Sequence, residues 1–169
     1  MQLFEPIRKK VTTPLQQNLR LDLPVDSPTF DPTAYKRLLG SILYVAIATR
    51  PDIAFACSHL ARFSTDPRSV HYEQVLRVLQ FLANTVDYVI TYDRDEDFVG
   101  FADASFGNCR KTGKSTTGYV LFYAGGPVLW RSFLQTVVAL STGEAECMAL
   151  SPLCKEVIFA TQLCTEIDF

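Results

Sequence analysis

The sequence has little of several features that would point directly to a function. It has no excess of positive charge, because 16 Lys and Arg face 18 Asp and Glu. The chain as a whole is therefore not a basic nucleic-acid binder. Its five cysteines include no Cys-x-x-Cys pair, which argues against a disulfide framework and a zinc site. No glycine-rich phosphate loop and no nucleophile elbow is present.

Long hydrophobic runs are also missing. The longest, Ile42 to Ala48, is far too short to span a bilayer, so we expect no membrane contact. The first ten residues contain no apolar stretch of signal-peptide length. Their basic character leaves a mitochondrial presequence as an alternative, which Pro6 and Pro14 disfavour. We therefore expect a cytoplasmic or nuclear protein with reduced cysteines.

Composition and periodicity predict an ordered chain with a helical first half. Hydrophobic residues make up 48% and charged residues 20%, which is typical of globular proteins. Four prolines punctuate residues 1–30, which we expect to form an irregular arm. Residues 31–86 show helical spacing of apolar side chains, and Asp31 before Pro32 is a start signal. Since Pro51 and Pro67 interrupt the pattern, the sequence predicts three packed helices.

From residue 87 the pattern changes to short strands. Residues 88–92 are rich in β-branched and aromatic types, and strands are expected over 98–103, 117–123 and 137–140. A hairpin turn at 124–126 returns the chain through Trp130, which we expect in the core. Helical spacing resumes at Thr142, although Pro152 predicts a kink or the start of a second helix. The predicted class is mixed, α+β or α/β.

Two carboxylates lie at positions suited to metal chemistry. Asp103 closes a predicted strand, and Glu144 lies in the first turn of the final helix. Carboxylates at such positions can converge on Mg²⁺, which prefers oxygen ligands. An alternative remains open for each: Asp103 can form a turn, and Ser141 with Glu144 spells a capping box.

A basic loop follows the first of these carboxylates. Arg110, Lys111 and Lys114 cluster between residues 108 and 115. Cations beside paired carboxylates suit a polyanionic substrate, so these three residues are candidate nucleic-acid contacts. Composition alone allows a simpler interpretation, in which they are solvated side chains of a hairpin loop.

Several long motifs resemble the Pol polyprotein of copia-type LTR retrotransposons. The stretches YKRLLGSILY (35–44) and TRPDIAFA (49–56) are similar to the segment that closes the reverse transcriptase. The stretches GFADASFG (100–107), KSTTGY (114–119) and VALSTGEAECMAL (138–150) are similar to its ribonuclease H domain. The motifs occur in the family's order and cover nearly the whole chain. The resemblance divides it into an irregular arm (1–30), a reverse transcriptase thumb or connection-like segment (31–86) and a partial ribonuclease H-like domain (87–169).

The resemblance implies a fold that begins β-β-β-α. It also implies that Asp103 and Glu144 bind Mg²⁺ and catalyse hydrolysis of the RNA strand of an RNA–DNA hybrid. The parent activity would be RNA-directed DNA synthesis coupled to this hydrolysis.

The chain departs from the family pattern where it matters for catalysis. The family's third carboxylate lies in a "DNQSA" segment that this sequence does not reach, the fourth is missing too, and the polymerase aspartates would lie upstream. Two carboxylates are too few for two Mg²⁺ ions. We therefore expect negligible hydrolysis by this chain alone, unless a second polypeptide completes the site. The alternative function is a nucleic-acid-binding or protein-interaction module, with self-association possible through an open sheet edge.

Overall fold

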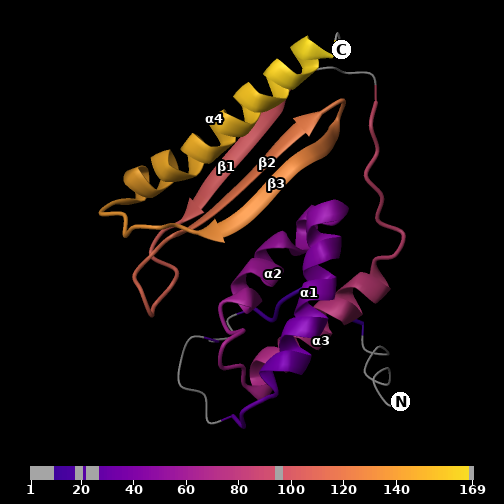
Figure 1. The fold of residues 1–169 in the computed structure, drawn as a ribbon, viewed down its shortest axis with the longest axis vertical. Helices are drawn as coiled ribbons and strands as arrows, with labels where there is room; N and C mark the ends of the chain where they lie inside the picture. The colour runs from indigo at the N-terminus through magenta and orange to yellow at the C-terminus, as the bar shows by residue number, and fades with distance from the viewer. Residues whose placement is uncertain (1–9, 18–20, 22–26, 94–96, 168–169) are drawn as a thin grey trace. The chain divides into compact units, whose positions relative to one another are not determined.

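The computed structural model describes residues 10–17, 21, 27–93 and 97–167. The chain forms two compact units, residues 1–89 and 90–169. Among the described residues, the first unit is helical and the second is an antiparallel sheet with one helix (Figure 1). This confirms a mixed α+β chain. Much of the arm expected over residues 1–30 lies outside the described residues.

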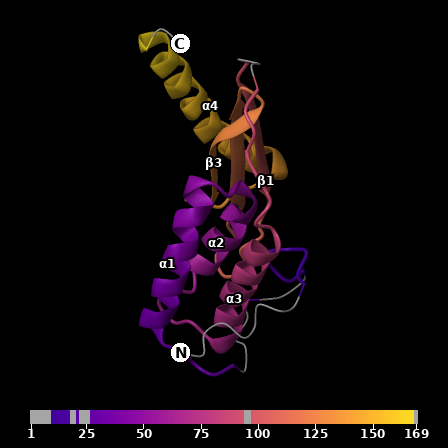
Figure 2. The ribbon, with the colours of Figure 1, turned by 90° about the vertical axis from the view of Figure 1, so that its right-hand side faces the viewer.

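The helices of the first unit begin where the sequence signals predict. Helix α1 spans Pro32–Ala48, and the Asp31 carboxylate accepts hydrogen bonds from the amides of Thr33 and Ala34 at 2.9 and 3.2 Å. A 3₁₀ turn, η2 (Pro51–Ile53), leads into α2 (Ala54–Ala61). Helix α3 spans Ser69–Asn84. The three helices pack together in Figure 2, which confirms the expected helical block.

A core of buried hydrophobic residues holds these helices together. Tyr35 from α1, Leu60 from α2 and Val75 from α3 are each fully buried. The Tyr35 hydroxyl donates a 2.9 Å hydrogen bond to the Leu60 carbonyl, which satisfies the one polar atom that this side chain brings inside. Burial raises the pKa of the Tyr35 hydroxyl well above its usual range.

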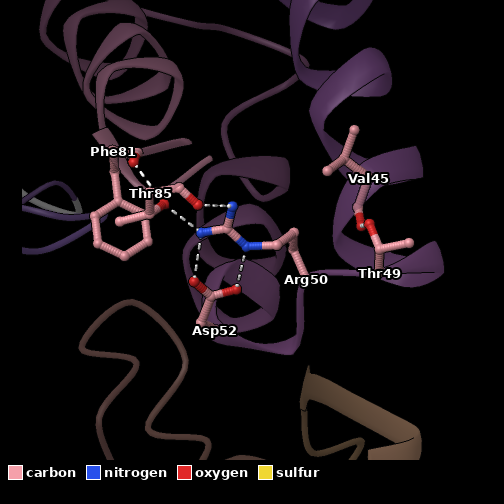
Figure 3. A network of polar contacts seen from close by, with 6 residues as sticks. All are labelled: Val45, Thr49, Arg50, Asp52, Phe81 and Thr85. Atoms are coloured by element: carbon pink, nitrogen blue, oxygen red, sulfur yellow. Dashed lines mark hydrogen bonds and ion pairs between the residues drawn. The ribbon is translucent and has the colours of Figure 1, made fainter. Parts of the chain in front are cut away.

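Arg50 ties the start of η2 to the end of α3 (Figure 3). Its guanidinium pairs with both oxygens of Asp52, at 2.9 and 2.7 Å. It also donates to the Thr85 carbonyl at 3.1 Å and to the Thr85 hydroxyl at 2.5 Å. The hydroxyl in turn donates to the Phe81 carbonyl at 2.8 Å, and the guanidinium lies over the Phe81 ring. Arg50 and Asp52, which lie in the stretch TRPDIAFA (49–56), thus have a structural role.

The second unit is an antiparallel sheet with strand order β1-β2-β3. Its strands are β1 (Val99–Ser105), β2 (Thr116–Tyr123) and β3 (Gly126–Leu134). Ala124 and Gly125 link β2 to β3 with positive φ angles of 51° and 76°. Two central residues with positive φ are typical of a type I′ hairpin. The hairpin turn that the sequence predicts at 124–126 is confirmed.

Helix α4 (Thr142–Glu166) covers one face of this sheet, lying over β1 and β2. Tyr119 and Leu121 of β2 pack with Leu153 and Ala160 of the helix in the unit's core. Pro152 lies inside the continuous helix and does not begin a second one. In the described part of the chain, α4 alone has the length and apolar composition of a membrane span, which is weak evidence for one.

Three local expectations for residues 88–140 are wrong. Residues 137–140 form no strand, because the chain here leaves β3 to reach α4 and Leu140 is 88% exposed. Residues 88–92 are also irregular. The chain just after them contacts the hairpin turn instead, since the Asp93 amide donates to the Ala124 carbonyl at 2.7 Å. Trp130 is only half-buried and lies outside the core, on the sheet face turned away from α4.

Candidate functional site

Asp103 lies in β1, opposite Gly118 of β2. Its neighbour Ala102 packs in the core beneath α4. Because side chains alternate along a strand, Asp103 projects from the face turned away from the helix. It is exposed, and no hydrogen bond or ion pair joins its carboxylate to another described residue. The interpretation of Asp103 as a turn-forming residue is wrong, since β1 continues through Ser105.

Glu144 caps the N-terminus of α4. The Ser141 hydroxyl accepts a 3.1 Å hydrogen bond from the Glu144 amide. One oxygen of the Glu144 carboxylate accepts a 2.7 Å hydrogen bond from the Leu140 amide. This reciprocal pair differs from a standard capping box in one respect, because the carboxylate bonds the residue before the cap. The capping role predicted from the sequence is therefore confirmed, and it occupies one of the two carboxylate oxygens.

Gln135 fixes the start of α4 on the sheet. It is 4% exposed, and its amide nitrogen donates to the Thr117 hydroxyl at 3.1 Å and to the Ala145 carbonyl at 2.9 Å. Thr117 pairs with Ala104, which follows Asp103. The backbones of Asp103 and Glu144 therefore lie at the same end of the sheet. Sequence reasoning missed Gln135, because a glutamine after a strand belongs to no motif.

The basic residues lie on a well-anchored loop between β1 and β2. Cys109 is buried and bonds across the loop: its amide donates to the Lys114 carbonyl at 3.0 Å, and its carbonyl accepts from the Gly113 amide at 2.7 Å. Arg110 and Lys111 are exposed and Lys114 is half-buried. None of the three pairs with an acidic residue that the structure describes. The loop thus presents its cations from a fixed backbone.

The residues present do not fit a two-metal centre. Such a centre usually requires three or four carboxylates. Within residues 10–17, 21, 27–93 and 97–167, no group of three or more His, Cys, Asp or Glu could hold a metal ion. Asp103 projects from the sheet face turned away from α4, and one oxygen of Glu144 already serves the helix cap. Asp103 and Glu144 therefore do not by themselves form a centre that could hold two Mg²⁺ ions.

Comparison with known proteins identifies the family. The chain is 33% identical over 166 residues to the retrovirus-related Pol polyprotein from transposon TNT 1-94 of Nicotiana tabacum. It is 31% identical over 161 residues to the corresponding polyprotein from transposon RE1 of Arabidopsis thaliana. Each match covers 94% of this chain. The chain belongs to the retrotransposon Pol polyprotein family.

This Pol chain spans only 12% of the length of the TNT 1-94 polyprotein and 11% of the RE1 polyprotein. A shorter relative is the secreted RxLR effector protein 161 of Plasmopara viticola, 38% identical over 129 residues, which cover 75% of this chain and 91% of that protein. No family model matches the Pol chain. No solved structure matches it either.

Proposed function

We propose that this chain is the junction of a copia-type reverse transcriptase and its ribonuclease H domain, and that it binds RNA–DNA hybrid without hydrolysing it alone. The observation that carries the proposal is the arrangement of the second unit. Three antiparallel strands precede one helix, and the helix starts at the end of the sheet where Asp103 lies. The parent activities, DNA synthesis and Mg²⁺-dependent hydrolysis of RNA, belong to the longer polyprotein in this proposal.

The binding part of the proposal rests on the anchored loop. Arg110 and Lys111 are exposed, and Lys114 is partly so. Because the Cys109 hydrogen bonds hold the loop backbone, the backbone that carries these cations loses little conformational freedom when they meet phosphates. The negative charge of the whole chain limits the affinity, so binding depends on this local patch.

A salt titration of hybrid binding tests this part. The variant Arg110→Ala/Lys111→Ala/Lys114→Ala should bind a labelled hybrid more weakly and lower the slope of log affinity against log salt by about 2 to 3, roughly one unit for each phosphate contact. Lys155→Ala, an exposed cation on α4, is the matched control and should leave the slope unchanged. Equal affinity and slope for the loop variant and the unaltered chain would exclude the loop as the binding site.

A nuclease assay tests the second part. With Mg²⁺ and a labelled RNA–DNA hybrid, the chain should cleave no faster than a buffer blank, because the described carboxylates are too few for a two-metal centre. Robust cleavage that Asp103→Asn abolishes would overturn this part and leave the binding result unaffected.

A further inference from the structure

The described parts of the N-terminal arm are bound along helix α3. At one end, the Arg77 guanidinium donates to the carbonyl and to the hydroxyl of Thr13, at 3.1 and 3.0 Å. At the other end, the Val70 amide donates to the Ser27 hydroxyl at 3.2 Å. The arm and the helix therefore run in opposite directions, and contacts hold them together from residue 77 of the helix back to residue 70.

His71 joins the arm to the helix between these two ends. It is the third residue of α3 and is only 4% exposed. Its Nδ1 accepts a 2.9 Å hydrogen bond from the backbone amide of Arg68, the residue that precedes the helix. Its Nε2 lies 3.2 Å from the carbonyl oxygen of Leu21 in the arm. Leu21 is 5% exposed and belongs, with Val11, to the core of the helical unit.

Only the uncharged ring, with its proton on Nε2, satisfies both contacts of His71. The Leu21 carbonyl can only accept, so Nε2 donates; the Arg68 amide can only donate, so Nδ1 carries no proton. In this state the ring acts as glutamate or glutamine does at the third position of a capping box. A proton on Nδ1 would set two N–H groups against each other and take away the acceptor of the Arg68 amide.

The surroundings of the ring also disfavour a positive charge. The ring stacks on Phe63 with centroids 4.0 Å apart, and its burial removes the water that would stabilise a charged form. Of the acidic residues nearby, Asp66 already pairs with Arg68 at 3.1 Å, and Glu73 is exposed. The titratable and charged side chains on the elements around the ring are those of His59, Arg62, Asp66, Arg68, Glu73 and Arg77. Three arginines against two carboxylates oppose a further cation at this place.

We propose that His71 is a proton-sensitive latch for the arm: the uncharged ring holds Leu21 and caps α3, and the charged ring releases both. Once charged, the ring has lost its contact with the Arg68 amide and moves towards water, so that the contact of Nε2 with the Leu21 carbonyl is lost as well. Release of Leu21 opens the part of the core to which it belongs. Acid therefore loosens the arm before it affects the interior of the helices.

Urea titrations at several pH values test the latch. A histidine in the unfolded chain takes up its proton near about pH 6.5, whereas the latched ring resists it, so the folded chain loses stability below that pH. The folding equilibrium constant should fall by up to about tenfold for each pH unit below this value. His71→Gln keeps an acceptor and a donor but does not titrate, so it should remove this fall. The chain has two histidines, and His59→Gln is the matched control that should keep it.

Hydrogen exchange of the full chain, read by mass spectrometry, shows whether the arm is the part that opens. After correction for the intrinsic exchange rates, peptides from residues 10–21 should exchange several-fold faster at about pH 5.5 than at about pH 7.5. Peptides from β2 should show no such change, because that strand is in the other unit. Equal protection of the arm at both pH values, or the same acid effect in His71→Gln, would overturn the proposal.

A proton NMR titration of the two imidazole rings tests the same idea in the unaltered chain, should His71→Gln not fold. The His71 ring, assigned by its persistence in His59→Gln, should take up its proton over the same pH range in which the arm amides lose protection. A ring that charges while the arm stays protected would exclude the latch. Asp22 follows Leu21 in the sequence and lies outside the described residues, so Asp22→Asn is the last control. Loss of the acid effect in this variant would assign the proton to the carboxylate instead. None of these results depends on hybrid binding.

Discussion

Removing the Arg50 side chain should destabilise the helical unit strongly. The side chain is only 11% exposed, and its guanidinium makes two hydrogen bonds to Asp52 and two to Thr85. Hydrogen bonds to a charged group each contribute about 1.5–3 kcal/mol, but bonds made by one guanidinium are not additive. Asp52 is 32% exposed, so water partly replaces its partner. We therefore expect Arg50→Ala to cost about 3–4 kcal/mol, in the range of a broken buried ion pair.

A urea titration followed by helical circular dichroism measures this loss. Arg50→Lys should recover only part of the stability, since an ammonium cannot bond Asp52 and Thr85 with the planar geometry of a guanidinium. Thr85→Val removes the hydroxyl and keeps the shape, so a double-mutant cycle with Arg50→Ala isolates their coupling, which we expect to be about 1 kcal/mol or more. A cost below about 1 kcal/mol for Arg50→Ala, as for an exposed ion pair, would refute the reasoning.

Three further predictions concern substitutions or labelling of single residues. Burial, followed by the hydrogen bond to Glu156, raises the pKa of Tyr119 from 10.0 to about 12. Between pH 10 and 12 the folded chain keeps the Tyr119 proton and the unfolded chain loses it, so the free energy of unfolding should fall as the pH rises through this range. Urea titrations at several pH values should show a smaller fall for Tyr119→Phe. Burial raises the pKa of the Cys57 thiol to about 12, so thiol reagents should label exposed Cys147 and Cys154 first and Cys57 only on unfolding. Gly126→Ala should lose about 1–3 kcal/mol, because its Cβ would lie 2.6 Å from the Tyr92 ring, whereas Gly118→Ala, with nothing within 4 Å, should be nearly neutral by the same titration.

Local signals in the sequence predict much of this fold because they act within a few residues. Asp31 and Pro32 start α1 through bonds that span three residues. Ala124 and Gly125 close the hairpin by their own backbone angles. The capping role of Glu144 is readable in the same way, since Ser141 lies three residues before it. Such features need no knowledge of the tertiary structure.

The features that sequence reasoning missed depend on distant partners. Residues 137–140 have the β-branched composition of a strand, but they lie outside the sheet of the described residues. Composition alone does not reveal whether a neighbouring strand is available for pairing. Pro152 is tolerated within α4 because the helix packs on the sheet, which offsets the missing backbone hydrogen bond. Gln135 joins Thr117 to Ala145 across 18 and 10 residues, so its importance becomes visible only in the fold.

A residue that belongs to a family motif can also have a purely structural role. Arg50 and Asp52 lie in a stretch that resembles the family motif, and the structure shows that their contacts hold η2 to the end of α3. Glu144 lies in another such stretch, and its carboxylate bonds the Leu140 amide at a helix start. Recurrence of a motif therefore does not separate a structural role from a catalytic one. A helix cap needs only one carboxylate oxygen, whereas a metal centre requires further oxygen ligands nearby. The hydrogen bond from the Leu140 amide to the Glu144 carboxylate is that of a helix cap.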